Sequence, residues 1–166
     1  MSRHHKTRSI GILVGLAAVL AFTLAPIAAS ASRVGTPTSR HAQRLAVGGD
    51  SWRLFKATND SRGRFNVPKL TLNRELSMVA RRHSLAMARS GELFHTGDVD
   101  VYLHGIEWHT WGENVGYTPG DVESVEQAFM ASPPHRGNIL NRAFRQVAIG
   151  SVRVDGTLWV TVFFFG

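Results

Sequence analysis

The chain has 166 residues, a formal net charge of +7 and no cysteine. That length is enough for one domain with a hydrophobic core, and the lack of cysteine means that the core must hold the fold without disulfides. The charge is moderate and contains no block of Lys and Arg, so we exclude the basic arms of nucleic-acid-binding proteins and expect no specific nucleic-acid binding.

Residues 1–31 have the three parts of a secretory signal peptide: a basic start, an apolar run over residues 10–29, and small residues at Ala29-Ser30-Ala31. An uncleaved membrane anchor is the alternative, because the run is nearly long enough to span the ~30 Å hydrocarbon core. Pro26 and the small residues after it favour cleavage. Cleavage removes three basic residues and no acid, which lowers the charge from +7 to +4.

The predicted export and the absence of cysteine together are typical of a bacterial protein. We therefore expect a protein that is secreted or held in the cell envelope of a bacterium, with no transmembrane span after cleavage. A charge of this size supports weak attraction to anionic wall polymers or lipid headgroups. We expect a monomer.

Residues 32–49 are rich in Ser, Thr, Arg, Gly and Ala without an apolar period, so we interpret them as a flexible spacer. The folded domain is predicted to occupy residues 50–166. Trp52 and Phe55 lie at helical spacing and predict a first helix over about residues 50–60.

A second helix is predicted over residues 74–90, between a capping Asn73 and a terminating Gly91. Its apolar stripe also carries His83, which we interpret as a hydrogen-bonded histidine of the core or its boundary. His95 follows on the loop that leaves this helix, which is a rigid support for a functional side chain.

Residues 97–110 show no clear period and predict a surface loop, with a short strand at residues 101–103. Asp121 can then cap a third helix, whose apolar stripe runs over residues 122–129. Pro133-Pro134 ends this helix, because a proline ring removes a donor and clashes with the preceding turn.

Two final strands are predicted over residues 147–154 and 157–165, joined by Asp155-Gly156, a dipeptide typical of two-residue hairpin turns. Both faces of the last strand are apolar. Such a strand belongs inside a sheet that is covered on both sides. The sequence therefore predicts an α/β (α+β) fold, a three-layer α-β-α sandwich around a mostly antiparallel sheet.

Three motifs follow one another along this domain: Phe94-His95-Thr96, Gly112-Glu113-Asn114-Val115 and Ser132-Pro133-Pro134-His135-Arg136-Gly137-Asn138-Ile139-Leu140. In this order, and with the final hairpin, they resemble the bacterial type of the CAP superfamily. These are the SCP-like extracellular proteins, named for cysteine-rich secretory proteins, antigen 5 and pathogenesis-related proteins. The resemblance covers about residues 50–166 and implies an α-β-α sandwich with a large open groove.

In many members of this family, two histidines and two glutamates line the groove and can hold a divalent metal. By position, His95 matches the first histidine and Glu113 the glutamate of the GEN motif, while His135 is our choice for the second histidine. The second glutamate has no counterpart, because its position falls at Ser132. The resemblance thus implies a site of His95, Glu113 and His135, with Zn²⁺ or Mg²⁺ as the candidate cofactor.

Two imidazoles and a carboxylate are a sound ligand set for a divalent metal, although without the resemblance three separate structural residues would be favoured. A second set is His104, His109 and Glu113. It does not have the one-face spacing of a metalloprotease helix, so we place it in a loop with His109 as a wall of the groove. Three further residues are expected to brace the site through hydrogen bonds: Asn114, Arg136 and Asn138.

We favour a binding module, whose groove takes a lipid, a cell-wall fragment or polymer, or an extracellular partner protein, with or without a metal. The alternative is a metal-assisted hydrolase of peptide, cell-wall or nucleic-acid bonds, with Glu113 as ligand or general base. The missing fourth carboxylate counts against an enzyme, and so does the absence of a serine elbow, a cysteine nucleophile and a phosphate-binding glycine loop. Adhesion without an intact groove is a third possibility.

Overall fold

The structure is a computed structural model that describes residues 38–166, with side chains from residue 48 onward except that of residue 100. The predicted signal peptide and the first part of the predicted spacer lie outside the described residues. Among the helices that are described, none combines the length and the apolar character that crossing a bilayer requires.

A four-stranded sheet forms the middle of the molecule, with its strands in the order β1-β3-β4-β2. The short β1 (Thr71–Leu72) runs parallel to β3 (Gln146–Val154). β3 pairs antiparallel with β4 (Thr157–Phe165), and β4 pairs antiparallel with β2 (Trp111–Thr118). β4 is therefore internal, and β2 is an edge strand.

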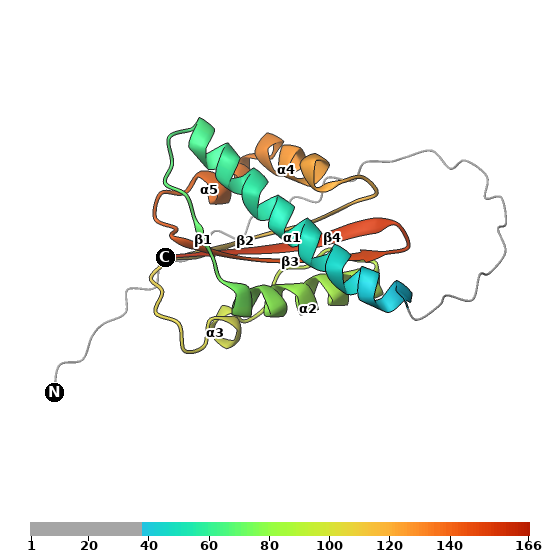
Figure 1. The fold of residues 1–166 in the computed structure, drawn as a ribbon. Coiled ribbons are helices and arrows are strands. Elements are labelled where there is room, and N and C mark those ends of the chain that lie inside the picture. The colour runs from blue at the N-terminus through green and yellow to red at the C-terminus, as the bar shows by residue number, and fades with distance from the viewer. Residues whose placement is uncertain (1–37) are drawn as a thin grey trace.

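Helices cover both faces of this sheet (Figure 1). On one face lie α1 (Thr38–Arg64), α4 (Val122–Ala131) and α5 (Pro133–Leu140), and on the other lie α2 (Arg74–Ser90) and α3 (Val99–Tyr102). The predicted three-layer α-β-α sandwich with a mostly antiparallel sheet is confirmed.

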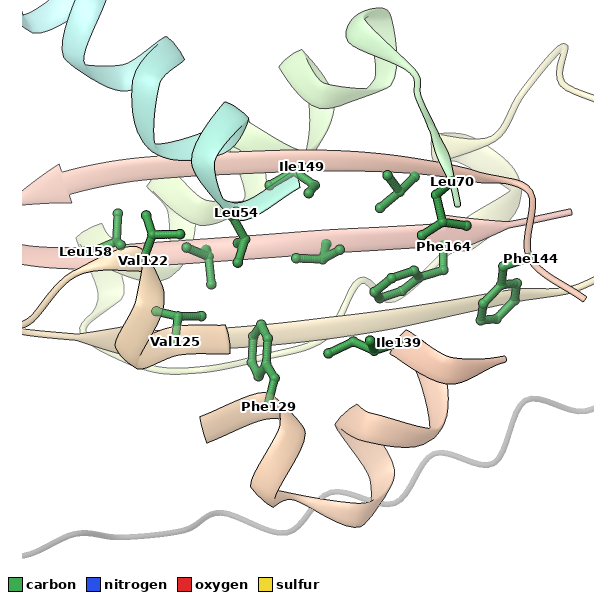
Figure 2. Close-up of a cluster of buried hydrophobic side chains, with 13 residues drawn as sticks. Leu54, Leu70, Val122, Val125, Phe129, Ile139, Phe144, Ile149, Leu158 and Phe164 are labelled. Atoms are coloured by element: carbon green, nitrogen blue, oxygen red, sulfur yellow. The ribbon is translucent and has the colours of Figure 1, made fainter. Parts of the chain in front are cut away.

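The hydrophobic core lies on both sides of β4, whose residues from 158 to 165 are all buried. Leu158 and Phe164 face the cluster that α1, α4 and α5 close (Figure 2). Phe163 and Phe165 face the cluster beneath α2. The two apolar faces that the sequence predicted for this strand thus fill two separate layers.

Caps set the helix ends where the sequence predicted them. Asn73 Oδ1 accepts a hydrogen bond from the Leu76 amide at 3.0 Å at the start of α2, and Gly91 ends this helix with φ 72°. Asp121 accepts one from the Ser124 amide at 2.9 Å at the start of α4. Each cap satisfies a backbone group that the helix leaves without a partner.

α2 lies close to β3 because Gly150 has no side chain. A Cβ at this position would lie 2.0 Å from the Arg81 nitrogen and 2.1 Å from the carbonyl carbon of Ala80. The buried Ser84 hydroxyl lies 3.1 Å from the Gly150 oxygen and 2.9 Å from Thr161 Oγ1. A polar contact therefore crosses the α2–sheet interface at its closest point.

Two segments differ from the sequence-based predictions. α1 begins at Thr38, so residues 38–49 are helical where a flexible spacer was predicted. These residues lack an apolar stripe, but between residues 42 and 46 they include good helix formers that continue the packed part of the helix.

Residues 101–103, predicted as a short strand, instead belong to α3 and the turn after it. Val99, Tyr102 and Leu103 are spaced as on one face of a helix, and all three pack in the cluster beneath α2. Burial of this face favours a helical turn over an isolated strand.

We expect alanine at Gly150 to destabilise the protein by about 1–3 kcal/mol, because the added methyl group overlaps the α2 backbone and forces the helix away from β3. The free energy of unfolding, measured by urea denaturation followed by circular dichroism, tests this.

The matched control is Gly63→Ala in α1, where a new Cβ meets nothing within 4 Å. Alanine in a helix is more favourable than glycine by about 1 kcal/mol, so this variant should be at least as stable as the parent. Equal stability of the two variants would contradict the close approach of α2.

Candidate functional site

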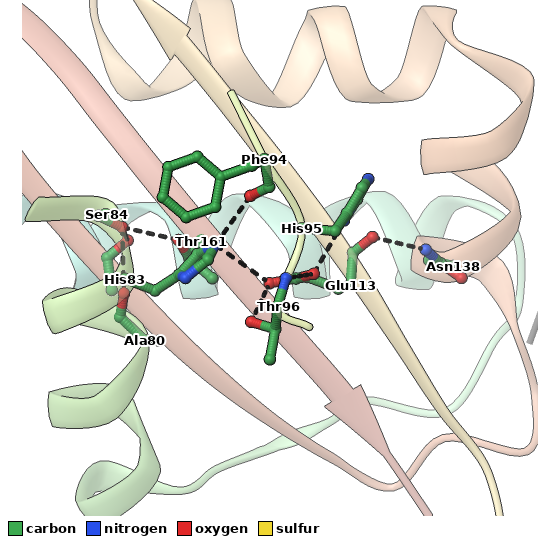
Figure 3. A network of polar contacts seen from close by, with 10 residues as sticks. Ala80, His83, Ser84, Phe94, His95, Thr96, Glu113, Asn138 and Thr161 are labelled. Carbon is green, nitrogen blue, oxygen red and sulfur yellow. Dashed lines mark hydrogen bonds and ion pairs between the residues drawn. The ribbon is translucent and has the colours of Figure 1, made fainter. Parts of the chain in front are cut away.

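Glu113 lies in the edge strand β2 and is buried, with 5% of its surface exposed. Its Oε2 accepts hydrogen bonds from His95 Nδ1 at 2.8 Å and from the Thr96 amide at 2.9 Å (Figure 3). Its Oε1 accepts one from the Thr96 hydroxyl at 2.8 Å. Donors to both oxygens compensate the loss of water around a buried carboxylate.

His83 of α2 forms the inner wall of this carboxylate site. Its Nε2 donates to the Phe94 carbonyl at 2.8 Å, and the same nitrogen lies 3.8 Å from Glu113 Oε1. The ring is 5% exposed and meets the Phe94 ring edge-on. His83 is thus a hydrogen-bonded buried histidine, as the sequence predicted, and it also holds the loop that carries His95.

The neighbours of Glu113 in β2 connect this strand to α5 on the opposite face of the sheet. Asn138 Nδ2 donates to the Glu113 carbonyl at 3.2 Å and to Asn114 Oδ1 at 2.8 Å. Asn114 Nδ2 donates to the His135 carbonyl at 3.0 Å. Gly112 leaves room for this arrangement, since a Cβ there would lie 2.6 Å from Asn138 Oδ1.

His135 lies in the first turn of α5, next to the end of α4. Its Nδ1 hydrogen-bonds the Ser132 hydroxyl at 2.9 Å, and its ring centroid lies 4.9 Å from that of Phe129. Burial lowers the pKa of His135, and the charge on His95 lowers it further.

The His95 ring has the opposite electrostatic bias. Its side chain is 32% exposed, and its Nε2 points away from Glu113 (Figure 3). The hydrogen bond from Nδ1 to Glu113 raises the pKa of His95, although burial opposes this effect. The site therefore pairs one imidazole that favours the charged form with one that favours the neutral form.

Two predicted residues contact other parts of the molecule. The His109 ring is exposed, its backbone amide donates to the Gly166 carbonyl at 2.8 Å, and no hydrogen bond joins the ring to Glu113 or His95 among the described residues. The Arg136 guanidinium lies over the Phe65 ring at 4.7 Å, where hydrogen bonds to the local turn were expected.

Sequence reasoning did not include Thr96 and Ser132 among the site residues. Thr96 is adjacent to His95 in a recognised motif. Ser132 lies three residues before His135, which is the spacing of neighbours on a helix surface. Neither signal says which side chain a hydroxyl will bond, because that depends on the tertiary fold.

The side chains of the described part of the chain do not fit the expected divalent metal. No group of three or more His, Cys, Asp or Glu side chains there could hold an ion. Both Glu113 oxygens accept from protein donors, and His95 and His135 each commit one ring nitrogen to a protein partner. Ser132 occupies the position where the family resemblance calls for a second carboxylate.

Comparison with known proteins extends the motif resemblance. The sequence profile of the cysteine-rich secretory protein (CAP) family matches residues 55–164. The uncharacterised protein YkwD of Bacillus subtilis (strain 168) is 28% identical over 141 residues, which cover 81% of this chain and 53% of that protein.

Solved structures of similar bacterial proteins share the fold. An extracellular protein containing an SCP domain from Bacillus anthracis superimposes with a TM-score of 0.68 at 26% identity, over 81% of this chain and 45% of that one. A cysteine-rich secretory protein from Staphylococcus aureus gives 0.61 at 25% identity, over 71% and 39%. The chain thus spans about half the length of these relatives or less.

The two histidines should titrate on opposite sides of pH 6.5, with His95 above and His135 below. Because folding raises the pKa of His95, its pairing with Glu113 contributes stability that is fully present below about pH 6.5 and is lost as the pH rises through the folded-state value. Imidazole ¹⁵N chemical shifts measured against pH give both values.

Glu113→Gln should lower the pKa of His95, because a neutral amide stabilises the imidazolium less than a carboxylate does. Glu107→Gln, a change at an exposed position, is the charge-matched control and should leave both histidines unchanged. An unaltered His95 titration in the Glu113 variant would contradict the pairing.

Proposed function

Because the chain belongs to the CAP family, in its bacterial type, we propose that it is an exported extracellular protein whose site at His95, Glu113 and His135 binds a ligand. The signal-like segment at residues 1–31 supports export. The description of the Bacillus anthracis relative as extracellular supports the same location. The protein would act after secretion or within the cell envelope.

The hydrogen bonds that Glu113 accepts are the observation that favours binding over catalysis. A general base needs an oxygen that is free to take a proton from the substrate, whereas both Glu113 oxygens accept from His95 and Thr96. The carboxylate therefore serves as the support that orients His95. No observation in the described structure favours the hydrolase alternative.

What the site offers to a ligand is a pair of imidazole nitrogens. Nε2 of His95 and Nε2 of His135 have no hydrogen-bond partner among the described residues, while Nδ1 of each ring is held. A ring biased toward the charged form, as His95 is, suits a ligand group that is anionic or accepts hydrogen bonds.

The segment that carries His95 also has partly exposed apolar side chains. Leu93 and Phe94 directly precede His95 and are 44% and 41% exposed. A ligand with an acidic or acceptor group beside an apolar portion fits both features. Lipids, cell-wall fragments with their carboxylates, and acidic segments of extracellular proteins all have this chemistry.

We expect the double variant His95→Ala/His135→Ala to bind such ligands about tenfold or more weakly, because it removes hydrogen bonds to a charged group. The probes are soluble peptidoglycan fragments and lysophosphatidylglycerol, titrated into the purified protein by calorimetry. His104→Ala, at an exposed position, is the control, and His109→Ala tests the predicted wall of the groove. Unchanged binding by the double variant would contradict the proposal, and fragments hydrolysed by the parent but not by Glu113→Gln would favour the enzyme.

Ligand binding should also be unaffected by treatment with EDTA, since the nitrogen and oxygen atoms at the site do not fit a divalent ion. The same calorimetric titration before and after chelation tests this. Loss of binding that returns with added Zn²⁺ or Mg²⁺ would show that a metal takes part.

A further inference from the structure

One end of the molecule carries exposed cations in segments that contain no acid. Residues 61–74 and 127–154 have neither Asp nor Glu. These segments meet where α1 ends, where α5 lies, and where the chain enters β1 and β3 (Figure 1). We call this surface the basic face, and its exposed cations are Arg64, Lys69, Arg136, Arg142 and Arg145.

A buried guanidinium holds the loops of the basic face together. Arg62 is fully buried, and its Nε donates to the Pro68 carbonyl at 2.7 Å. Its Nη1 donates to the carbonyls of Ile139 and Asn141 at 2.7 and 3.0 Å, and its Nη2 to that of Phe144 at 3.4 Å. One side chain therefore connects the segment before β1 with the segment between α5 and β3.

The exposed cations follow these anchored carbonyls directly in the chain. Lys69 comes after Pro68, and the two arginines of the α5–β3 segment, Arg142 and Arg145, come after Asn141 and Phe144. Burial lowers the pKa of Arg62 to about 10, and the charges of Arg145 and Arg142 add to this effect, which supports their proximity. The positive charges are thus positioned by the fold.

The remaining contacts of the basic face compensate only a small part of its charge. Arg142 Nη2 donates to the Asn66 carbonyl at 2.7 Å, and Arg136 lies over the Phe65 ring. None of the five exposed cations forms an ion pair with a carboxylate in the described part of the chain. Asp60, one helical turn before Arg64, is exposed, and the charge of Arg64 also lowers the pKa of the buried Glu126, so two acids lie near five cations.

We propose that the basic face binds a linear polymer that carries repeated phosphate groups. Clustered like charges raise the energy of the free protein, and a polyanion relieves this repulsion while releasing its own counterions. Four of the five cations are arginines, whose planar guanidinium groups match phosphate geometry. The proposal does not depend on the ligand of the His95 site, although Arg136 of the basic face directly follows His135 of that site in α5.

The apolar content of the basic face favours a polymer over a membrane. Phe65 is its exposed aromatic residue, at 45%, and the Arg136 guanidinium covers its ring. Insertion into a bilayer surface relies on several apolar side chains on one face. Exposed apolar residues such as Met78 and Leu93 lie instead on α2 and the loop after it, in the other helical layer.

The test uses fluorescently labelled linear polyphosphate and the purified protein, with binding measured by anisotropy at several salt concentrations. We expect log K to fall linearly with log salt concentration for the parent. The triple variant Arg64→Gln/Lys69→Gln/Arg136→Gln should bind about tenfold more weakly at low salt, with a slope shallower by about 2.

The matched control is Arg81→Gln/Arg82→Gln/Arg89→Gln, which removes the same charge from exposed positions on α2. It should bind as the parent does. Equal losses in the two triple variants would mean that net charge alone drives binding, and would overturn the proposal, as would failure of the parent to bind. Neither the Arg64 nor the Lys69 side chain donates a hydrogen bond within the described part of the chain, so the double variant Arg64→Gln/Lys69→Gln serves if the triple variant does not fold.

A second titration uses vesicles of equal parts phosphatidylglycerol and phosphatidylcholine. We expect weak binding that the triple variant barely changes. Stronger binding to the vesicles than to polyphosphate, lost in the triple variant, would assign the basic face to a membrane and overturn the polymer as its partner.

Discussion

The burial of the Glu113 carboxylate is the constraint on which the site depends. A buried charge is tolerated only where donors replace its lost water, and here the donors come from His95 and Thr96 in a loop far away in sequence. The same residue accepts a hydrogen bond from Asn138 through its backbone carbonyl. One position in an edge strand thus ties together α2, the loop after it and α5, and the orientation of His95 follows from these ties.

Glu113, Arg62 and Glu126 are three buried ionisable groups whose surroundings differ. Both Glu113 oxygens accept hydrogen bonds from neighbouring donors, and the Arg62 guanidinium donates to four carbonyls. Glu126, between α1 and α4, accepts from the Thr58 hydroxyl at 3.0 Å, but its Oε1 has no partner among the described residues. Burial raises the pKa of Glu126, which favours the protonated form of this acid.

Features that depend on local sequence were predictable. The caps Asn73 and Asp121 and the two apolar faces of β4 come from residue types at short spacing, and the structure agrees. Residues 101–103 were assigned wrongly because so short an apolar segment fits a strand and a helical turn equally well. Residues 38–49 were assigned wrongly because they lack an apolar stripe, which is the signal by which a helix is recognised in a sequence.

The arrangement of the site could not be derived in this way. The grouping of His95, Glu113 and His135 came from the family resemblance alone, because the strand order that brings their segments together has no periodic signal in the sequence. The identities of these residues also did not predict their roles. Two imidazoles and a carboxylate suggested a metal, whereas the Thr96 hydroxyl bonds Glu113 Oε1 and the Ser132 hydroxyl bonds His135 Nδ1, two contacts that no motif identified.

The position of β4 in the chain has a consequence for how the protein acquires its fold. This internal strand separates the two core layers and pairs with both β2 and β3, yet it follows every other described element in sequence. Neither core layer can close before residues 157–165 are present, because Leu158 and Phe164 belong to one layer and Phe163 and Phe165 to the other. Closure of both layers therefore depends on pairing β4 with segments that are distant in sequence, and such non-local steps make folding slow.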